Sequence, residues 1–272
     1  MRYLRSFQLS AKKMKARTIY PYNILANKRS EVLVFDTVTI LYGTNGSGKS
    51  TLLNILAQKL GIPGAEPPKQ GGSVDYFANY VNESQISFEL DEVTNRDFNI
   101  PANSRYIKSE DILYEIKKIQ QEAILREGYF YERGKLGETK AERSEHLETY
   151  EMKKSIDRLS FSQEKYSNGE TAKHIYEDFI EPEGIYLLDE PEASLSPENQ
   201  LKLVDFIADA ARFLNCQFII ATHSPFLLGG LESTIYQLDL PGLHTCDWTS
   251  LENVQTYQRF FAKHSTSFNN AN

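Results

Sequence analysis

Cysteine is scarce in this sequence, which contains only Cys216 and Cys246. Neither lies in a cluster of metal-ligand residues, so the sequence excludes a disulfide framework and favours a reducing compartment. No hydrophobic run approaches the length that crosses a membrane, and the basic N-terminus lacks the continuous apolar core of a signal peptide. The apolar and charged fractions, 40% and 25%, are those of an ordinary globular protein. We therefore expect a soluble, cytoplasmic protein.

Acidic residues are absent from residues 1–30, although the whole chain carries a net charge of -7. The basic residues of this segment are Arg2, Arg5, Lys12, Lys13, Lys15, Arg17, Lys28 and Arg29. Such a segment can contact a nucleic acid or another polyanion. It can also form the solvated face of a strand whose lysines discourage edge pairing, and we favour this second interpretation. The acidity of the remaining chain argues against broad, non-specific DNA binding.

A glycine-rich stretch at residues 41–51 matches the phosphate-binding pattern Gly-x-x-x-x-Gly-Lys-Ser/Thr, known as Walker A. The β-branched run 37–42 predicts a buried strand, and the residues after Ser50 predict a helix that ends at Gly61. Loop glycines and the helix N-terminus together direct backbone N–H groups onto an anion. We expect Lys49 to reach the outer phosphates and the Ser50 hydroxyl to face Mg²⁺. The predicted nucleotide-binding residues of this loop are Gly43, Thr44, Asn45, Gly46, Ser47, Gly48, Lys49, Ser50 and Thr51.

Acidic residues follow a second buried strand, predicted at 185–188. Asp189 is expected to hold Mg²⁺, directly or through water, and Glu190 to act as general base on the attacking water. His223 follows the next predicted strand, 217–221, from where it can reach the γ-phosphate or the water. Because ligands bind at the carboxyl ends of the strands in open α/β sheets, these side chains are expected near the phosphate loop. The predicted catalytic residues are therefore Glu190, His223 and Lys49, and the predicted metal ligands are Ser50 and Asp189.

The order of predicted elements indicates an α/β protein with a mostly parallel central sheet. Short strands are predicted at 3–9, 18–24, 85–90 and 105–108, and a loop at 61–72. Apolar residues at helical spacing from about residue 112 begin a charged helical insert that spans 109–165. Ser196 followed by Pro197 predicts the start of a further helix.

Four motifs in this order resemble those of ABC-type ATPases: residues 43–50, 166–170, 185–190 and 222–223. Residues 166–170, Tyr-Ser-Asn-Gly-Glu, are similar to that family's signature loop, usually Leu-Ser-Gly-Gly-Gln, and keep Ser167 and Gly169. The sequences around 189–197 and 221–225 look like the soluble branch of the family, which includes small stand-alone bacterial ATPases and is related to RecF-, Rad50- and SMC-type heads. Transporter domains of the family more often carry Thr-Ser-Ala-Leu-Asp after the Asp-Glu-Pro.

The resemblance implies a P-loop NTPase fold with an N-terminal antiparallel β-region and a helical insert. It implies a single domain over 1–272, with a helical and signature subdomain inserted at 105–180. It also implies Mg²⁺-dependent ATP hydrolysis by a head-to-tail homodimer, in which Ser167 and Gly169 of one copy cap the γ-phosphate held by the other. Residues 193–197 match the loop that crosses this interface. A role in DNA maintenance or defence would follow from the soluble branch.

Several points stay open at the level of sequence. Tyr20 and Tyr22 are equal candidates for stacking on the base, with core packing as the ordinary alternative. The family's glutamine loop corresponds to 108–111, which we favour, or to Gln85. The C-terminal aromatic residues, among them Trp248, form either a docking surface or, as we favour, a helix that covers the sheet.

The partner and the biological role are also open. The downstream partner is either a nucleic acid or a protein. The rival functions are a nucleotide-binding subunit of an ABC transporter and an ATP sensor with slow turnover.

Overall fold

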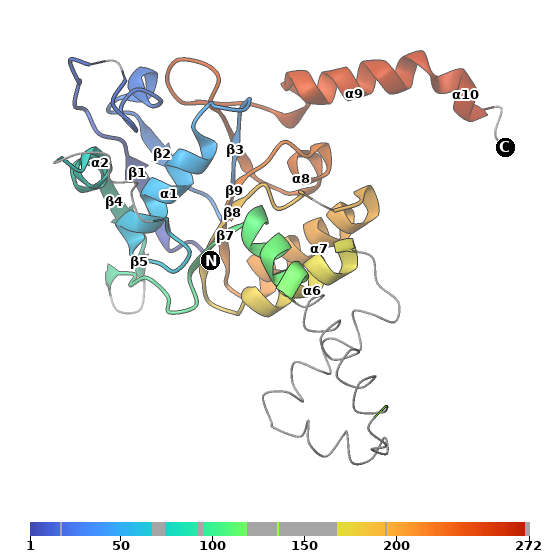
Figure 1. The fold of residues 1–272 in the computed structure, drawn as a ribbon, viewed down its shortest axis with the longest axis horizontal. Helices are drawn as coiled ribbons and strands as arrows, with labels where there is room; N and C mark the ends of the chain where they lie inside the picture. The colour runs from blue at the N-terminus through green and yellow to red at the C-terminus, as the bar shows by residue number, and fades with distance from the viewer. Residues whose placement is uncertain are drawn as a thin grey trace.

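The computed structural model describes residues 1–16, 18–66, 74–91, 95–118, 135, 168–193 and 195–269, with residues 168–173, 268 and 269 described by backbone only. A six-stranded sheet in the order β11-β10-β3-β9-β8-β7 forms its centre (Figure 1). β10, β3, β9, β8 and β7 are parallel neighbours, and β11 pairs antiparallel with β10 at one edge. The strands are β3 (Val38–Tyr42), β7 (Arg105–Lys108), β8 (Ile185–Asp189), β9 (Gln217–Ala221), β10 (Thr234–Gln237) and β11 (His244–Thr245). The predicted mostly parallel sheet is confirmed.

Apolar residues cover both faces of this sheet because β3, β8 and β9 are buried along their whole length. Leu187 and Ile219 point to the face covered by α1 (Lys49–Leu60). Leu188 and Ile220 point to the opposite face, together with the apolar residues of the helices there. Those helices are α6 (Asn168–Phe179), α7 (Pro197–Phe213) and α8 (Pro225–Gly230). The sheet therefore separates α1 from α6 and α7.

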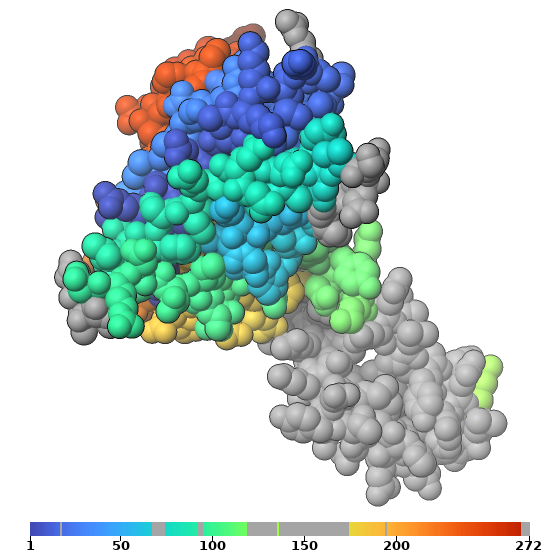
Figure 2. Space-filling model, turned by 90° about the vertical axis from the view of Figure 1, so that its left-hand side faces the viewer, coloured from blue at the N-terminus to red at the C-terminus, as the bar shows by residue number. Residues whose placement is uncertain are grey.

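A second, three-stranded antiparallel sheet packs on the α1 side, in the order β2-β1-β4. Its strands are β1 (Leu4–Gln8), β2 (Val32–Val34) and β4 (Gln85–Phe88), and the hairpin β5 (Leu90–Asp91) and β6 (Arg96–Asp97) follows it. Figure 2 shows that the N-terminal segment and the segment from α2 (Tyr76–Glu83) to β7 lie side by side on one face of the molecule. The predicted N-terminal antiparallel region is thus present.

Gln217 joins the two sheets through four hydrogen bonds from a fully buried side chain. Its Oε1 accepts from the backbone N–H groups of Tyr3 (3.0 Å) and Leu4 (2.8 Å). Its Nε2 donates to the carbonyl oxygens of Leu4 (2.8 Å) and Asp36 (3.0 Å). The amide of this central-sheet residue therefore satisfies backbone groups at the start of β1, in the antiparallel sheet, and at Asp36.

Helix boundaries follow the predicted signals. α1 begins after Gly48 and ends at Gly61, and both glycines have left-handed backbone conformations. The side chain of Ser196 caps α7 by accepting from the N–H of Asn199, with Pro197 at the first helical position. Residues 109–118 are helical, so the helix predicted from about residue 112 begins at 109. Most of the remaining predicted insert lies outside the described residues.

One predicted strand is absent from the structure, and the structure contains elements that were not predicted. Residues 18–25 form turns instead of a strand, and the short 3-10 helix η1 (Ala26–Lys28) follows them. Tyr22 and Leu25 are nevertheless buried, and they enter the core from these turns. The sequence also did not predict α2, whose N-terminus is capped by Asp75, nor β10.

The C-terminal segment also differs, because it does not cover the sheet. After η2 (Trp248–Ser250), helix α9 (Glu252–Lys263) buries only Val254 and extends away from the body, followed by α10 (Ser265–Asn269) (Figure 1). Tyr257, Phe260 and Phe261 are 50%, 56% and 51% exposed. The expectation of a covering helix is therefore wrong.

Replacing Gln217 should destabilise the junction between the two sheets. In Gln217→Ala the backbone groups of Tyr3 and Leu4 lose their partners inside the protein, so the free energy of unfolding should fall by about 3 kcal/mol. Urea unfolding followed by circular dichroism measures this change. The control Gln85→Ala, at an exposed position of β4, should change it by less than about 0.5 kcal/mol. Equal effects of the two substitutions would contradict the role of Gln217.

Candidate nucleotide site

The phosphate loop connects the carboxyl end of β3 to the N-terminus of α1. Gly46 and Gly48 have φ angles of 85° and 100°, which other residues adopt only with strain. A Cβ atom at Gly46, which is exposed, would meet nothing within 4 Å, so the space beside this residue is open. The N-cap residue Gly48 offers no side-chain hydrogen bond to the first turn of α1. The loop can therefore direct free backbone N–H groups onto an anion.

Lys49 is buried beneath this loop, at 5% exposure. Its Nζ donates to the carbonyl oxygen of Gly43 at 2.7 Å and lies 2.7 Å from Nε2 of His223. Burial lowers the pKa of Lys49, while the charges of Glu190 and Asp189 oppose this shift. The ammonium group thus joins the loop after β3 to the residue after β9.

Asp189 ends β8 and is 8% exposed. Its Oδ2 accepts a hydrogen bond from the hydroxyl of Tyr106 at 3.1 Å, whereas its Oδ1 is buried without a hydrogen-bond partner. Burial raises the pKa of Asp189, and the Ser50 and Tyr106 hydroxyls oppose this shift. Asp189 and Ser50 are therefore close enough to interact across the sheet edge.

This pair fits a hard divalent cation. A buried carboxylate oxygen without a partner is costly, and a cation such as Mg²⁺ would satisfy it together with the Ser50 hydroxyl. Across the described residues, no group of three or more His, Cys, Asp or Glu side chains could hold a metal by itself. Mg²⁺ bound here would take its remaining ligands from phosphate and water, as it commonly does.

Glu190 and His223 lie beside Lys49. Glu190 has a φ of 48°, an uncommon conformation for a residue other than glycine, and its N–H donates to the carbonyl oxygen of Ala221 at 2.8 Å. Its half-exposed side chain lies 3.8 Å from Nε2 of His223. Burial and the charge of Lys49 lower the pKa of His223, so the neutral imidazole predominates at pH 7. Lys49, Glu190 and His223, predicted from three separate motifs, are thus brought together.

Three residues of the site did not emerge from the sequence. Tyr106 donates to Asp189, and Glu192 accepts the backbone N–H groups of His223 and Ser224. Asp239, which follows β10, accepts from both the N–H and the hydroxyl of Thr44, at 2.8 and 2.7 Å. Recognising 234–237 as a strand would have indicated Asp239, because polar residues after neighbouring parallel strands share one edge.

The two candidate tyrosines have different environments. Tyr20 is 46% exposed, and its hydroxyl donates to the Thr51 hydroxyl of α1 at 3.3 Å. Its ring stacks against Phe77 with a centroid distance of 5.7 Å. Tyr22 is 5% exposed and donates to Glu83. Tyr20 is the aromatic ring that lies both at the surface and beside the helix of the phosphate loop.

Other predicted positions are placed as follows. Lys108 pairs with Asp189 in the β7–β8 register, so 108–111 follow a strand that ends at the site. Gln85 lies in β4, in the antiparallel sheet. Gly169 lies in the first turn of α6, whereas Ser167 and Ser194 are outside the described residues.

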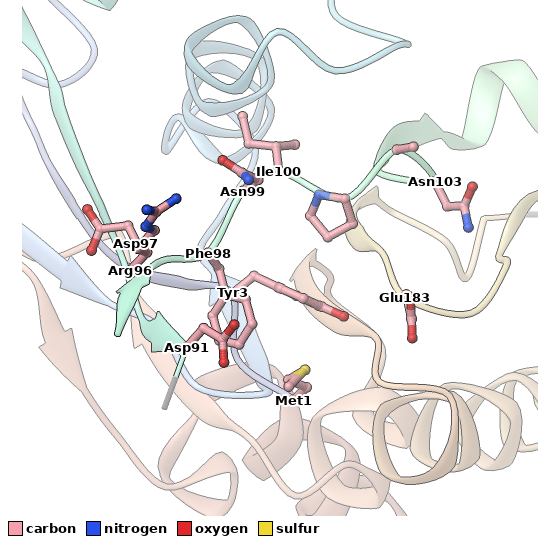
Figure 3. Close-up of a pocket in the computed structure, with 12 residues that line it drawn as sticks. Met1, Tyr3, Asp91, Arg96, Asp97, Phe98, Asn99, Ile100, Asn103 and Glu183 are labelled. Atoms are coloured by element: carbon pink, nitrogen blue, oxygen red, sulfur yellow. The ribbon is translucent and has the colours of Figure 1, made fainter. Parts of the chain in front are cut away.

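A separate cavity of about 1010 Å³ lies at the opposite end of the central strands (Figure 3). Asn103 and Glu183, which precede β7 and β8, line it together with residues of the β5–β6 hairpin. Tyr3 and Phe98 meet edge to face in its wall, with a centroid distance of 5.4 Å. None of the predicted site residues lines this cavity.

Comparison with known families agrees with this geometry. The model of the family described as "ABC transporter" matches residues 32–193, more than half of the 272-residue chain. The chain belongs to the ABC transporter family of ATPase domains. This family binds and hydrolyses ATP. A second model, described as "AAA domain, putative AbiEii toxin, Type IV TA system", matches residues 175–229 of this ABC ATPase.

Solved structures similar to this ABC ATPase share little sequence with it. A nucleotide-free ATP-binding cassette from an ABC transporter is 14% identical, with 95% of this chain and 96% of that chain covered and a TM-score of 0.45. The SMC head domain from Thermotoga maritima is 14% identical, with coverages of 91% and 99% and a TM-score of 0.44. An SMC head bound to the C-terminal winged-helix domain of ScpA is 16% identical, with coverages of 90% and 98% and a TM-score of 0.48. No curated protein matches the chain.

Within the described ranges, no helix of this ABC ATPase is both long enough and apolar enough to cross a membrane.

The contact between Asp239 and Thr44 should hold Thr44 in place within the phosphate loop. In Asp239→Ala the amide hydrogen of Thr44 loses its acceptor, so it should exchange with solvent at least about tenfold faster, which corresponds to a loss of about 1.4 kcal/mol. Hydrogen–deuterium exchange of the nucleotide-free protein measures this rate. The control Glu232→Ala, at an exposed acidic residue before β10, should leave it unchanged. Unchanged exchange in Asp239→Ala would contradict the contact.

Proposed function

We propose that the chain binds Mg-ATP at the edge formed by the phosphate loop, Asp189 and His223, and hydrolyses it there. The observation that carries this proposal is the convergence of Lys49, Glu190 and His223 beside the Asp189–Ser50 pair. Lys49 begins the helix after β3, Glu190 follows β8 and His223 lies just after β9. Each has a chemistry that phosphoryl transfer to water requires. When bound, Mg-ATP supplies the phosphoanhydride to be cleaved and the divalent charge that stabilises it.

The chain's own residues divide into two sets. The backbone of 43–48 and the ammonium group of Lys49 bind the phosphates, with Thr51 beside them at the start of α1. Ser50 and Asp189 hold Mg²⁺ through the hydroxyl and the unpartnered carboxylate oxygen.

Glu190 accepts the proton of the attacking water because its carboxylate is half exposed and faces the same edge. His223 donates or accepts a hydrogen bond near the γ-phosphate, from a neutral imidazole held beside Lys49.

A second copy of the chain completes the site. α1 and α6 lie on opposite faces of the central sheet, so Gly169 in the first turn of α6 is separated by the sheet from its own phosphate loop. A head-to-tail homodimer brings Ser167 and Gly169 of one copy to the nucleotide of the other. We further propose a single domain over 1–272, with a subdomain at 105–180, and a cytoplasmic location in keeping with the free thiols of Cys216 and Cys246.

The ATP-dependent dimer would act as a switch in DNA maintenance or defence. The description of the second family model, which names a toxin of a toxin–antitoxin system, supports a defence role. The alternative is a nucleotide-binding subunit of a transporter, which the name of the larger matching family supports. Co-purification with a membrane-spanning subunit would favour this alternative.

Substituting Glu190 should trap the dimer. Glu190→Gln retains the shape of the side chain but cannot take a proton from water, so ATP should remain bound and hold two copies together. Size-exclusion chromatography with light scattering, in the presence of Mg-ATP, should then detect a dimer that is absent without nucleotide. The double variant Glu190→Gln/Ser167→Arg should bind ATP and stay monomeric. A Glu190→Gln protein that binds ATP as a monomer would refute the head-to-tail model.

Tyr20 should contribute to binding of the base. Tyr20→Ala removes the exposed ring, so affinity for ATP should fall about tenfold, as expected for the loss of one stacking contact. Tyr20→Phe retains the ring and should bind ATP within about twofold of wild type. Calorimetry with ATP and with inorganic tripolyphosphate separates the effects, because only ATP has a base. Equal losses for both ligands would disprove stacking.

A further inference from the structure

The main chain of His223 is held from two sides. On one side its N–H donates to Oε1 of Glu192 at 2.7 Å. On the other side its carbonyl oxygen accepts from Nδ2 of Asn253 at 2.8 Å. These two residues come from different parts of the chain, the loop after β8 and the first turn of α9. The residue between them therefore has little freedom to rotate its backbone.

Glu192 holds more than one residue of the loop after β9. The same Oε1 also accepts from the N–H of Ser224 at 3.1 Å, and the Thr222 hydroxyl interacts with the carboxylate as well. The other oxygen, Oε2, is buried without a hydrogen-bond partner. A buried carboxylate is costly, and its hydrogen bonds to these N–H groups offset part of that cost.

Asn253 connects the start of α9 to the loop after β9 through its hydrogen bond to His223. Leu251 and Val254 fix the start of α9, because both are buried in the core on the face of the central sheet that α6 and α7 cover. The amide of Asn253 is therefore presented to His223 by a rigid support, although the rest of α9 extends away from the body.

The imidazole meets several groups when the main chain is held in this way. Lys49 lies 2.7 Å and Glu190 3.8 Å from Nε2, and the Tyr42 ring meets the imidazole edge to face. Asp239 contributes a negative charge from the end of β10. A rotation of the His223 backbone would move Nε2 away from Lys49 and Glu190, because both distances depend on the backbone conformation of His223.

We propose that Glu192 and Asn253 are positioning residues, which clamp the main chain of His223 so that its imidazole stays between Lys49 and Glu190. The proposal rests on the proposed ATPase function, in which His223 acts beside the γ-phosphate. Through Asn253, the C-terminal helix becomes a support of the nucleotide site, although it contributes no group to the phosphates or the metal.

Asn253→Ala tests the clamp, because it removes one donor at a half-buried position. The matched control is Gln258→Ala, at an exposed position of the same helix. Two measurements are made on both variants and on wild type. The first is the pKa of the His223 imidazole by NMR in the nucleotide-free protein, where the five histidines are few enough for assignment with His223→Gln. The second is kcat and KM for Mg-ATP.

In Asn253→Ala the pKa of His223 should rise towards its ordinary value of 6.5. The reason is that burial and Lys49 lower this pKa in the wild type, and both effects weaken when the imidazole moves. The kcat should fall about three- to tenfold, as expected for one lost hydrogen bond, whereas KM should stay within about twofold. Gln258→Ala should match wild type in both measurements. Glu192→Gln, which retains an oxygen that can accept both N–H groups, should stay closer to wild type in kcat than Glu192→Ala.

The proposal is overturned if the His223 pKa in Asn253→Ala equals that of the control, whatever happens to kcat. A change in pKa with unchanged kcat would overturn the link between the clamp and the reaction. Failure of the proposed function has a different signature, since the wild-type protein would then not hydrolyse ATP. The NMR measurement would still decide whether Asn253 positions His223 in that case.

Discussion

The arrangement of the site depends on the contacts of the Lys49 ammonium group. A buried charge is unfavourable unless other groups surround it, and here the Gly43 carbonyl oxygen and the His223 imidazole do so. One of these partners belongs to the phosphate loop and the other to the loop after β9. The same contact therefore holds the loop in shape before nucleotide binds and places His223 beside it.

The order of strands determines what can reach this contact. β3 lies between β10 and β9, with β8 and β7 beyond β9. The residues at or just after the carboxyl ends of these strands consequently form a row along one edge. Asp239 binds Thr44 on one side of β3, and His223, Asp189 and Lys108 follow on the other. A parallel sheet collects such residues because all its carboxyl ends lie together.

The same sheet also lies between α1 and α6, because its two apolar faces place these helices on opposite sides. This separation of the phosphate-loop helix from the helix that contains Gly169 is consistent with the proposed head-to-tail dimer. The start of α9 is bound to the main chain of His223 through Asn253, and the rest of the helix extends away from the body. This helix therefore links the nucleotide-binding edge of the sheet to the exterior of the molecule.

The sequence by itself determined the features that depend on neighbours along the chain. The phosphate loop, the caps of α1 and α7, the buried strands and the acids at the end of β8 all follow from local spacing and from short continuous apolar runs. Only the tertiary structure showed that Tyr20 is exposed and Tyr22 is buried, revealed Glu192, Asn253 and Asp239 as partners of the site, and showed that α9 does not pack over the sheet. These contacts join residues far apart in the chain, and they depend on which strands are neighbours and which surfaces remain open, quantities that local spacing does not contain.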